Sequence, residues 1–101
     1  MHVIDTDTAS GFFDVVGGTE RSRAATMILD PGEETGGPSN SHPDNDQWLY
    51  VKSGAGTAVI EGEEQPLSAG DLVLIEAGET HAISAGDAGP LETINVYAPP
   101  R

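Results

Sequence analysis

Glycine, proline and clusters of acidic residues divide the chain into short apolar or alternating segments, and this pattern limits the folds it can adopt. No stretch of ten or more residues places apolar side chains at i, i+3, i+4 and i+7, so we expect no substantial helix. Short segments at this spacing are typical of an all-β sandwich or barrel. The expected strands are residues 12–16, 23–29, 47–53, 55–61, 71–76, 81–85 and 91–97. We place residues 12–16 at a sheet edge, residues 53–56 in a hairpin turn between two strands, and residues 62–64 in a turn.

The length and composition predict one domain with a thin core. A chain of 101 residues fits a single domain, and only 21 of these residues are Leu, Ile, Val or Phe. This share is close to the limit of about 20% below which disorder is common, so the core must be packed efficiently or supplemented by a partner chain. Because the chain has no cysteine, disulfide scaffolds, thiolate metal sites and cysteine nucleophiles are excluded.

The sequence shows no sign of a membrane or secreted protein. No apolar run approaches the length of about 20 residues that spans a bilayer. Residues 1–10 lack the basic segment followed by an apolar one that marks a secretory signal. We therefore expect the protein in the cytoplasm.

Seventeen acidic residues against four basic ones give a formal charge of −13. Such a surface repels nucleic-acid phosphates and anionic lipid, so we expect neither as a partner. Two explanations of the charge remain open. The protein is an ordinary acidic protein, or it is adapted to high salt, which screens the repulsion between its own charges.

One polar segment, residues 31–46, contains no aliphatic residue and no Phe, Trp or Tyr. Structureless loops longer than about 12–15 residues are uncommon in compact domains and are often functional or disordered. His42 lies near the end of this segment, and His81 also lies where a loop meets an expected strand, whereas His2 is expected to be solvated. We therefore interpret the segment as the rim of a binding site, with a mobile loop as the alternative.

Residues 40–47 (Asn-Ser-His-Pro-Asp-Asn-Asp-Gln), followed by Gly54, resemble the first motif of the cupin superfamily. That motif has two histidines separated by one residue, then a glutamate after three or four more, then a glycine seven positions later. Residues 70–81 resemble the second motif, which runs glycine, five residues, proline, one residue, glycine, two residues, histidine. The spacing from Gly70 to Gly78 and His81 matches at every step.

The resemblance covers residues 27–97 and implies a jelly-roll β-barrel, also described as a double-stranded β-helix. By this resemblance, residues 1–101 form one cupin domain, with N-terminal edge strands in residues 1–20 and the barrel core in about residues 21–98. It also implies the metal ligands, which fall on Asn40, His42, Gln47 and His81.

Only the two histidines of this ligand set are retained. Asn40 replaces a histidine and Gln47 replaces the glutamate, while Glu76 stands where proline is usual and Ala85 where asparagine is usual. Two imidazoles and two amide oxygens carry no negative charge, so affinity for Fe, Mn, Ni or Zn should fall. Two alternatives stay open: a weak divalent-metal site, or a metal-free pocket in which Gln47 hydrogen-bonds both histidines.

The alternation of side chains along the strands predicts a pocket and an interface. Gln47 shares one strand face with Leu49, and His81 also shares its face with apolar neighbours. If these faces point inward, polar groups lie among apolar walls, as in small-molecule sites. Trp48 and Tyr50 occupy the opposite face, which we expect to pack against another sheet or chain. The cupin resemblance implies a homodimer.

Three functions are compatible with the sequence. The retained histidines favour a small-molecule site over a purely structural acidic domain. The altered ligand set favours a barrel that binds a divalent metal weakly, or a small organic ligand directly. The alternative is a metal-dependent enzyme of the dioxygenase or isomerase type that acts on a small organic substrate. The fold does not decide between them.

Overall fold

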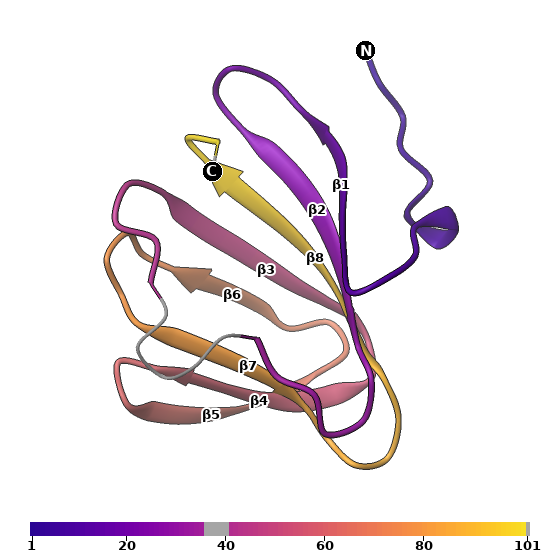
Figure 1. Ribbon diagram of the computed structural model, residues 1–101, viewed down its shortest axis with the longest axis vertical. Helices are drawn as coiled ribbons and strands as arrows, with labels where there is room; N and C mark the ends of the chain where they lie inside the picture. Colours follow the sequence, from indigo (N-terminus) through magenta and orange to yellow (C-terminus); the bar gives the residue numbers. More distant parts are fainter. Residues whose placement is uncertain (36–40, 101) are drawn as a thin grey trace.

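The computed structural model describes residues 1–35 and 41–100, so Asn40 lies outside the described residues. Within them, the elements are a 3-10 turn, η1 (Thr6–Thr8), and the strands β1 (Phe13–Gly18), β2 (Arg23–Leu29), β3 (Asp46–Ser53), β4 (Ala55–Ile60), β5 (Glu63–Ser68), β6 (Leu72–Ile75), β7 (His81–Ala85) and β8 (Leu91–Ala98) (Figure 1). No helix in this part of the chain is long and apolar enough to cross a lipid bilayer.

The described strands form two antiparallel sheets. The large sheet has the order β1-β2-β8-β3-β6, and the small sheet has the order β5-β4-β7. In Figure 1 the small sheet lies at the lower left, while β1 and β2 lie at the upper right. This architecture is a jelly-roll barrel, which confirms the all-β prediction.

Most strand predictions are confirmed, because those segments carry local apolar patterns. Residues 23–29 and 81–85 match β2 and β7 in full, and β1 is an edge strand as expected. The predicted hairpin turn at residues 53–56 is wrong, since β3 and β4 belong to different sheets. Gly54 forms the corner between them with φ +88°, and a Cβ there would lie 2.1 Å from the Pro90 carbonyl oxygen.

The predicted turn at residues 62–64 is correct only for Gly62, because residues 63 and 64 belong to β5. The turn is formed by Glu61 and Gly62, and both have positive φ, as a two-residue type I′ hairpin requires. β5 begins directly after it, and only Leu67 of this strand is buried. As an edge strand, β5 tolerates Pro66 and exposed acidic residues, so its sequence resembles a loop.

The core fills the space between the two sheets. In β3, Gln47, Leu49 and Val51 are buried and alternate with the exposed Trp48 and Tyr50, which confirms the expected alternation. The apolar cluster draws on both sheets and consists of Met27, Leu29, Leu49, Val51, Ala58, Leu67, Ile75, Ile83, Ala85 and Leu91. Its packing holds the inward faces of β2, β3, β7 and β8 in place, and these strands carry the site described below.

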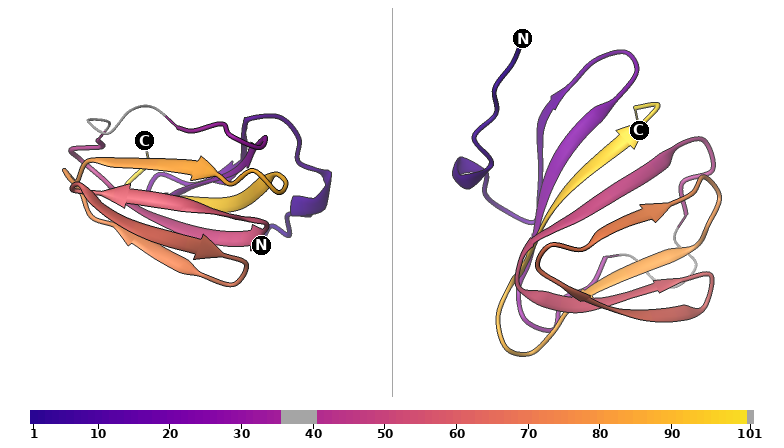
Figure 2. Two further views of the ribbon diagram at one scale, coloured as in Figure 1. Left: turned by 90° about the horizontal axis from the view of Figure 1, so that it is seen from below. Right: turned by 180° about the vertical axis from the view of Figure 1, so that it is seen from behind.

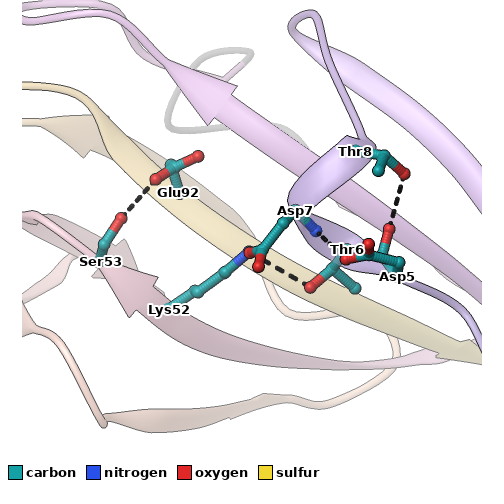
Figure 3. A network of polar contacts seen from close by, with 7 residues as sticks. All are labelled: Asp5, Thr6, Asp7, Thr8, Lys52, Ser53 and Glu92. Carbon is teal, nitrogen blue, oxygen red and sulfur yellow. Dashed lines mark hydrogen bonds and ion pairs between the residues drawn. The ribbon is translucent and has the colours of Figure 1, made fainter.

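The N-terminal segment lies outside the barrel, at the opposite side of the molecule from the small sheet (Figures 1 and 2). Figure 3 shows its attachment: the Lys52 ammonium forms an ion pair with Asp7 and donates a hydrogen bond to Thr6 Oγ1 over 3.3 Å. Asp5 caps η1 by accepting a hydrogen bond from the Asp7 backbone N–H. These contacts connect the start of the chain to the outward face of β3.

Candidate functional site

A cavity of about 610 Å³ opens between the inward faces of the large sheet and β7. Its lining within the described residues consists of Phe12, Phe13, Arg23, Met27, Thr35, His42, Gln47, His81, Ile83 and Tyr97. The volume falls within the range of about 300–1,000 Å³ that is common for small-molecule sites. His42, Gln47 and His81, which the sequence singled out, therefore line one cavity.

Backbone pairing brings the two histidines together. Ser41 forms an antiparallel bridge with Thr80, and the Gly78 N–H donates to the His42 carbonyl oxygen over 2.9 Å. The segment that carries His42 is thus held beside the start of β7. The two imidazole rings are buried, with centroids 4.7 Å apart and an interplanar angle of 58°.

A tight turn before β7 sets the orientation of His81. The Glu79 N–H donates to the Glu76 carbonyl oxygen over 3.0 Å, and Gly78 takes φ +86° in this turn. His81 Nδ1 lies 3.3 Å from the Glu79 carbonyl oxygen. Because a carbonyl oxygen only accepts hydrogen bonds, Nδ1 is the donor in this contact. Nε2 is therefore the His81 nitrogen through which a metal would bind.

Gln47 enters the cavity from β3 and is only 4% exposed. Its Nε2 donates to Asn95 Oδ1 over 3.2 Å, while Asn95 Nδ2 donates to Thr93 Oγ1 over 3.1 Å and to the Ala25 carbonyl oxygen over 3.5 Å. The Ala25 oxygen accepts only, so it fixes the orientation of the Asn95 amide, and this amide in turn fixes that of Gln47.

The consequence is a buried acceptor with no partner. Gln47 Oε1 accepts no hydrogen bond from any described residue, and so none from either histidine. An unsatisfied buried acceptor costs about 1–3 kcal/mol, which a bound donor or cation would relieve. This observation disagrees with the metal-free alternative, in which Gln47 would form hydrogen bonds with both histidines.

The three residues fit a divalent metal, as a neutral donor set. Imidazole nitrogens and an amide oxygen are accepted by first-row metals, but they supply no charge to balance the ion. Across residues 1–35 and 41–100, no group of three or more His, Cys, Asp or Glu side chains is placed to hold a metal. Binding through His42, Gln47 and His81 would therefore be weaker than in a set with a carboxylate.

Sequence reasoning missed the residues that complete the cavity wall, of which Arg23 and Tyr97 are the most informative. Arg23 pairs with Tyr97 across β2 and β8, and Tyr97 pairs with Gln47 across β8 and β3. Residues paired directly across a sheet share a face, so Arg23, Tyr97 and Gln47 form one inward row. The Tyr97 ring also meets His42 edge-on, with centroids 5.9 Å apart. The sequence did contain a signal for Arg23, because it lies on the same strand face as Ala25 and Met27.

Residues 25–97 match the family model described as a cupin domain. The chain belongs to the cupin family. The matched region runs from Ala25 in β2 to Tyr97 in β8. It contains every cavity residue named above except Phe12, Phe13 and Arg23.

Solved cupin-like structures share the fold over most of the chain. The BH2720 protein of Bacillus halodurans has a TM-score of 0.88 and 24% identity, covering 95% of this chain and 76% of its own. KdgF of Halomonas sp. has a TM-score of 0.80 and 29% identity, covering 88% and 78%. A Thermotoga maritima protein named as a predicted oxalate decarboxylase has a TM-score of 0.77 and 24% identity, covering 85% and 77%. Among curated proteins, none matches this cupin.

Proposed function

We propose that this cupin binds a small organic ligand in the cavity, or a divalent metal weakly, through His42, Gln47 and His81. The observation that carries the proposal is Gln47 Oε1, a buried oxygen without a described partner beside two buried imidazoles. A site built for structure alone would satisfy this oxygen within the protein. A ligand donor or a cation completes it instead.

His42, Gln47 and His81 would hold a divalent metal at this site. A divalent ion there would polarise an oxygen of the bound organic molecule as a Lewis acid. The protein contributes the orientation of its donors. The Asn95 amide orients Gln47 by accepting a hydrogen bond from its Nε2, and the Glu79 carbonyl orients His81 by accepting one from its Nδ1.

Substitution of Gln47 by glutamate tests the metal form. Q47E would place one negative charge in the cavity that both histidines line, so we expect zinc affinity to rise about tenfold or more. Calorimetry with zinc chloride on the native protein and on Q47E measures the change. Gln65→Glu is the matched control, because it adds the same charge on the exposed edge strand β5. Equal zinc binding by all three proteins would contradict the metal site.

The second candidate function is a metal-dependent enzyme of the dioxygenase or isomerase type. The close pair of buried histidines favours it over a structural domain, since both rings line an open cavity. It requires the metal form, so failure of zinc, manganese, nickel and ferrous ions to bind would exclude it. Ligand binding without metal would leave the binding function intact.

A further inference from the structure

The charge around the cavity is opposite in sign to that of the whole chain. The protein carries 17 acidic and four basic residues, yet no Asp or Glu is among the described residues that line the cavity. One of the four basic residues, Arg23, does line it. The cavity thus has a positive group at one position and neutral groups elsewhere, within a molecule that repels anions in general.

Arg23 and Gln47 lie at the two ends of one row. Both pair directly with Tyr97 of β8, because β2 and β3 lie on either side of β8. Neighbouring strands are about 4.8 Å apart, so the backbones of Arg23 and Gln47 are separated by about 10 Å. Arg23 is exposed and Gln47 is buried, which places the charge toward solvent and the unpaired acceptor deep in the cavity. A single small molecule is long enough to reach both.

The space between these two ends is bounded by apolar groups. Five of the lining side chains are aromatic or aliphatic: Phe12, Phe13, Met27, Ile83 and Tyr97. The rings of Phe13 and Tyr97 are in contact, with centroids 6.4 Å apart. Such walls favour a ligand with an apolar body.

We propose that the cavity binds a small organic carboxylate, with its carboxylate on Arg23, its apolar body against the Phe13 and Tyr97 rings, and a hydrogen-bond donor on Gln47 Oε1. This inference rests on the proposed binding function and specifies its ligand class. A guanidinium matches the two oxygens of a carboxylate in its plane. A phosphate dianion fits less well, because the single charge of Arg23 would have to offset the repulsion of two negative charges by a protein of net charge −13.

The test compares three carboxylates with their neutral amides: hexanoate and hexanamide, 3-phenylpropanoate and 3-phenylpropanamide, and 4-hydroxybenzoate and 4-hydroxybenzamide. Affinities are measured on the full chain, with a chelator present, from the shifts of backbone amide signals of the cavity residues. We expect at least one carboxylate to bind about tenfold tighter than its amide, because its hydrogen bonds to Arg23 are charge-assisted. Benzoate is added as a reference ligand without the hydroxyl donor, and 4-hydroxybenzoate should bind tighter than it.

Arg23→Gln should abolish the preference for the carboxylate, and Arg23→Lys should recover part of it, because lysine keeps the charge without the planar fork. Arg21→Gln is the matched control, since Arg21 is exposed and is not among the cavity residues. An unchanged amide spectrum outside the cavity shows that each variant is folded.

Three results would overturn the inference: equal binding of carboxylates and amides, no binding of any carboxylate, or equal loss of the preference in Arg21→Gln. The failure of the proposed function looks different. In that case neither the carboxylates, nor the amides, nor zinc would bind in the cavity, whereas amide or zinc binding without a carboxylate preference removes only the ligand class.

Discussion

Each face of the large sheet at β3 and β8 carries a few residues that are unusual for their surroundings. Toward the barrel, the amides of Gln47 and Asn95 are almost completely buried. Toward the outside, Trp48 is 43% exposed and Leu72 on β6 is 61% exposed. An inward amide is costly unless it is hydrogen-bonded or binds a ligand, and an outward aromatic patch is wasteful unless something covers it. At both places a further molecule would offset the cost: a ligand at the buried amides, or a covering chain at the exposed aromatic residues.

The outer patch is continuous across the large sheet. Trp48 pairs with Leu74 on one side and Val96 on the other, and Tyr50 pairs with Leu72 and Ile94. The N-terminal residues 1–4 share a hollow with Val96, so they lie along one side of this face. Within the described residues, Trp48, Tyr50, Leu72 and Leu74 remain exposed.

The largest expected effect is a difference in the free energy of unfolding between variants of the inward face and variants of the outward face. Leu49 is fully buried, so Leu49→Ala should lower the free energy of unfolding by about 2–5 kcal/mol. Leu72 is mostly exposed, so Leu72→Ala should change it by no more than about 0.5 kcal/mol in dilute protein. Urea denaturation at low protein concentration measures both. A comparable loss in the two variants would show that the outer face is already packed within one chain.

The second expected effect concerns assembly. We propose that a second copy of the chain covers the outer patch in a symmetric homodimer, because self-association buries the aromatic face of a thin-cored domain. Light scattering at tens of micromolar protein should give twice the monomer mass of 10.5 kDa. Trp48→Lys should restore the monomer, whereas Gln65→Lys on β5 should not. A monomer mass for the native protein would contradict the proposal.

Local sequence patterns predicted most strands well. They did not predict features that depend on pairing with a distant strand. β2 and β7 could be read from their own residues, since apolar side chains dominate both. β5 could not, because only Leu67 of it is buried and its hairpin requires Glu61, a residue other than glycine, at positive φ. Its strand state comes from pairing with β4.

The candidate site shows the same limit. His42, Gln47 and His81 were found from motif spacing, which records the pairing of distant segments indirectly. Arg23 was missed, because its place beside Gln47 depends on the register of two strands with β8. The unpaired state of Gln47 Oε1 depends on the buried Asn95 amide, and no sequence pattern relates the two.

The third expected effect concerns salt. A net charge of −13 opposes the compact state, and the acidic residues lie away from the cavity on the exterior. The Debye length falls from about 10 Å in 0.1 M salt to about 3 Å in 1 M salt, so screening should relieve the repulsion. The thermal midpoint should therefore rise by several degrees between low salt and molar potassium chloride. A midpoint that is constant or falls would leave adaptation to high salt without support.

The smallest expected effect concerns the N-terminal cover of the outer face. The hydrogen bond from Lys52, together with the charge of Lys52, lowers the pKa of Asp7 below its ordinary value. A carboxyl group whose pKa is lower in the folded state stabilises that state above its unfolded pKa of about 3.9 and loses this contribution as the pH falls through the folded value. The attachment of η1 should thus be complete at neutral pH and should weaken below about pH 4. Because Asp7 is largely exposed, the global stability should barely respond, and the readout must be local.

Hydrogen exchange at the amides of residues 6–8 should accelerate in Asp7→Asn at neutral pH, while Asp44→Asn, which changes an exposed carboxyl outside this contact, should leave it unchanged. Equal exchange in the native protein and Asp7→Asn would mean that the ion pair does not hold the N-terminal segment against the sheet.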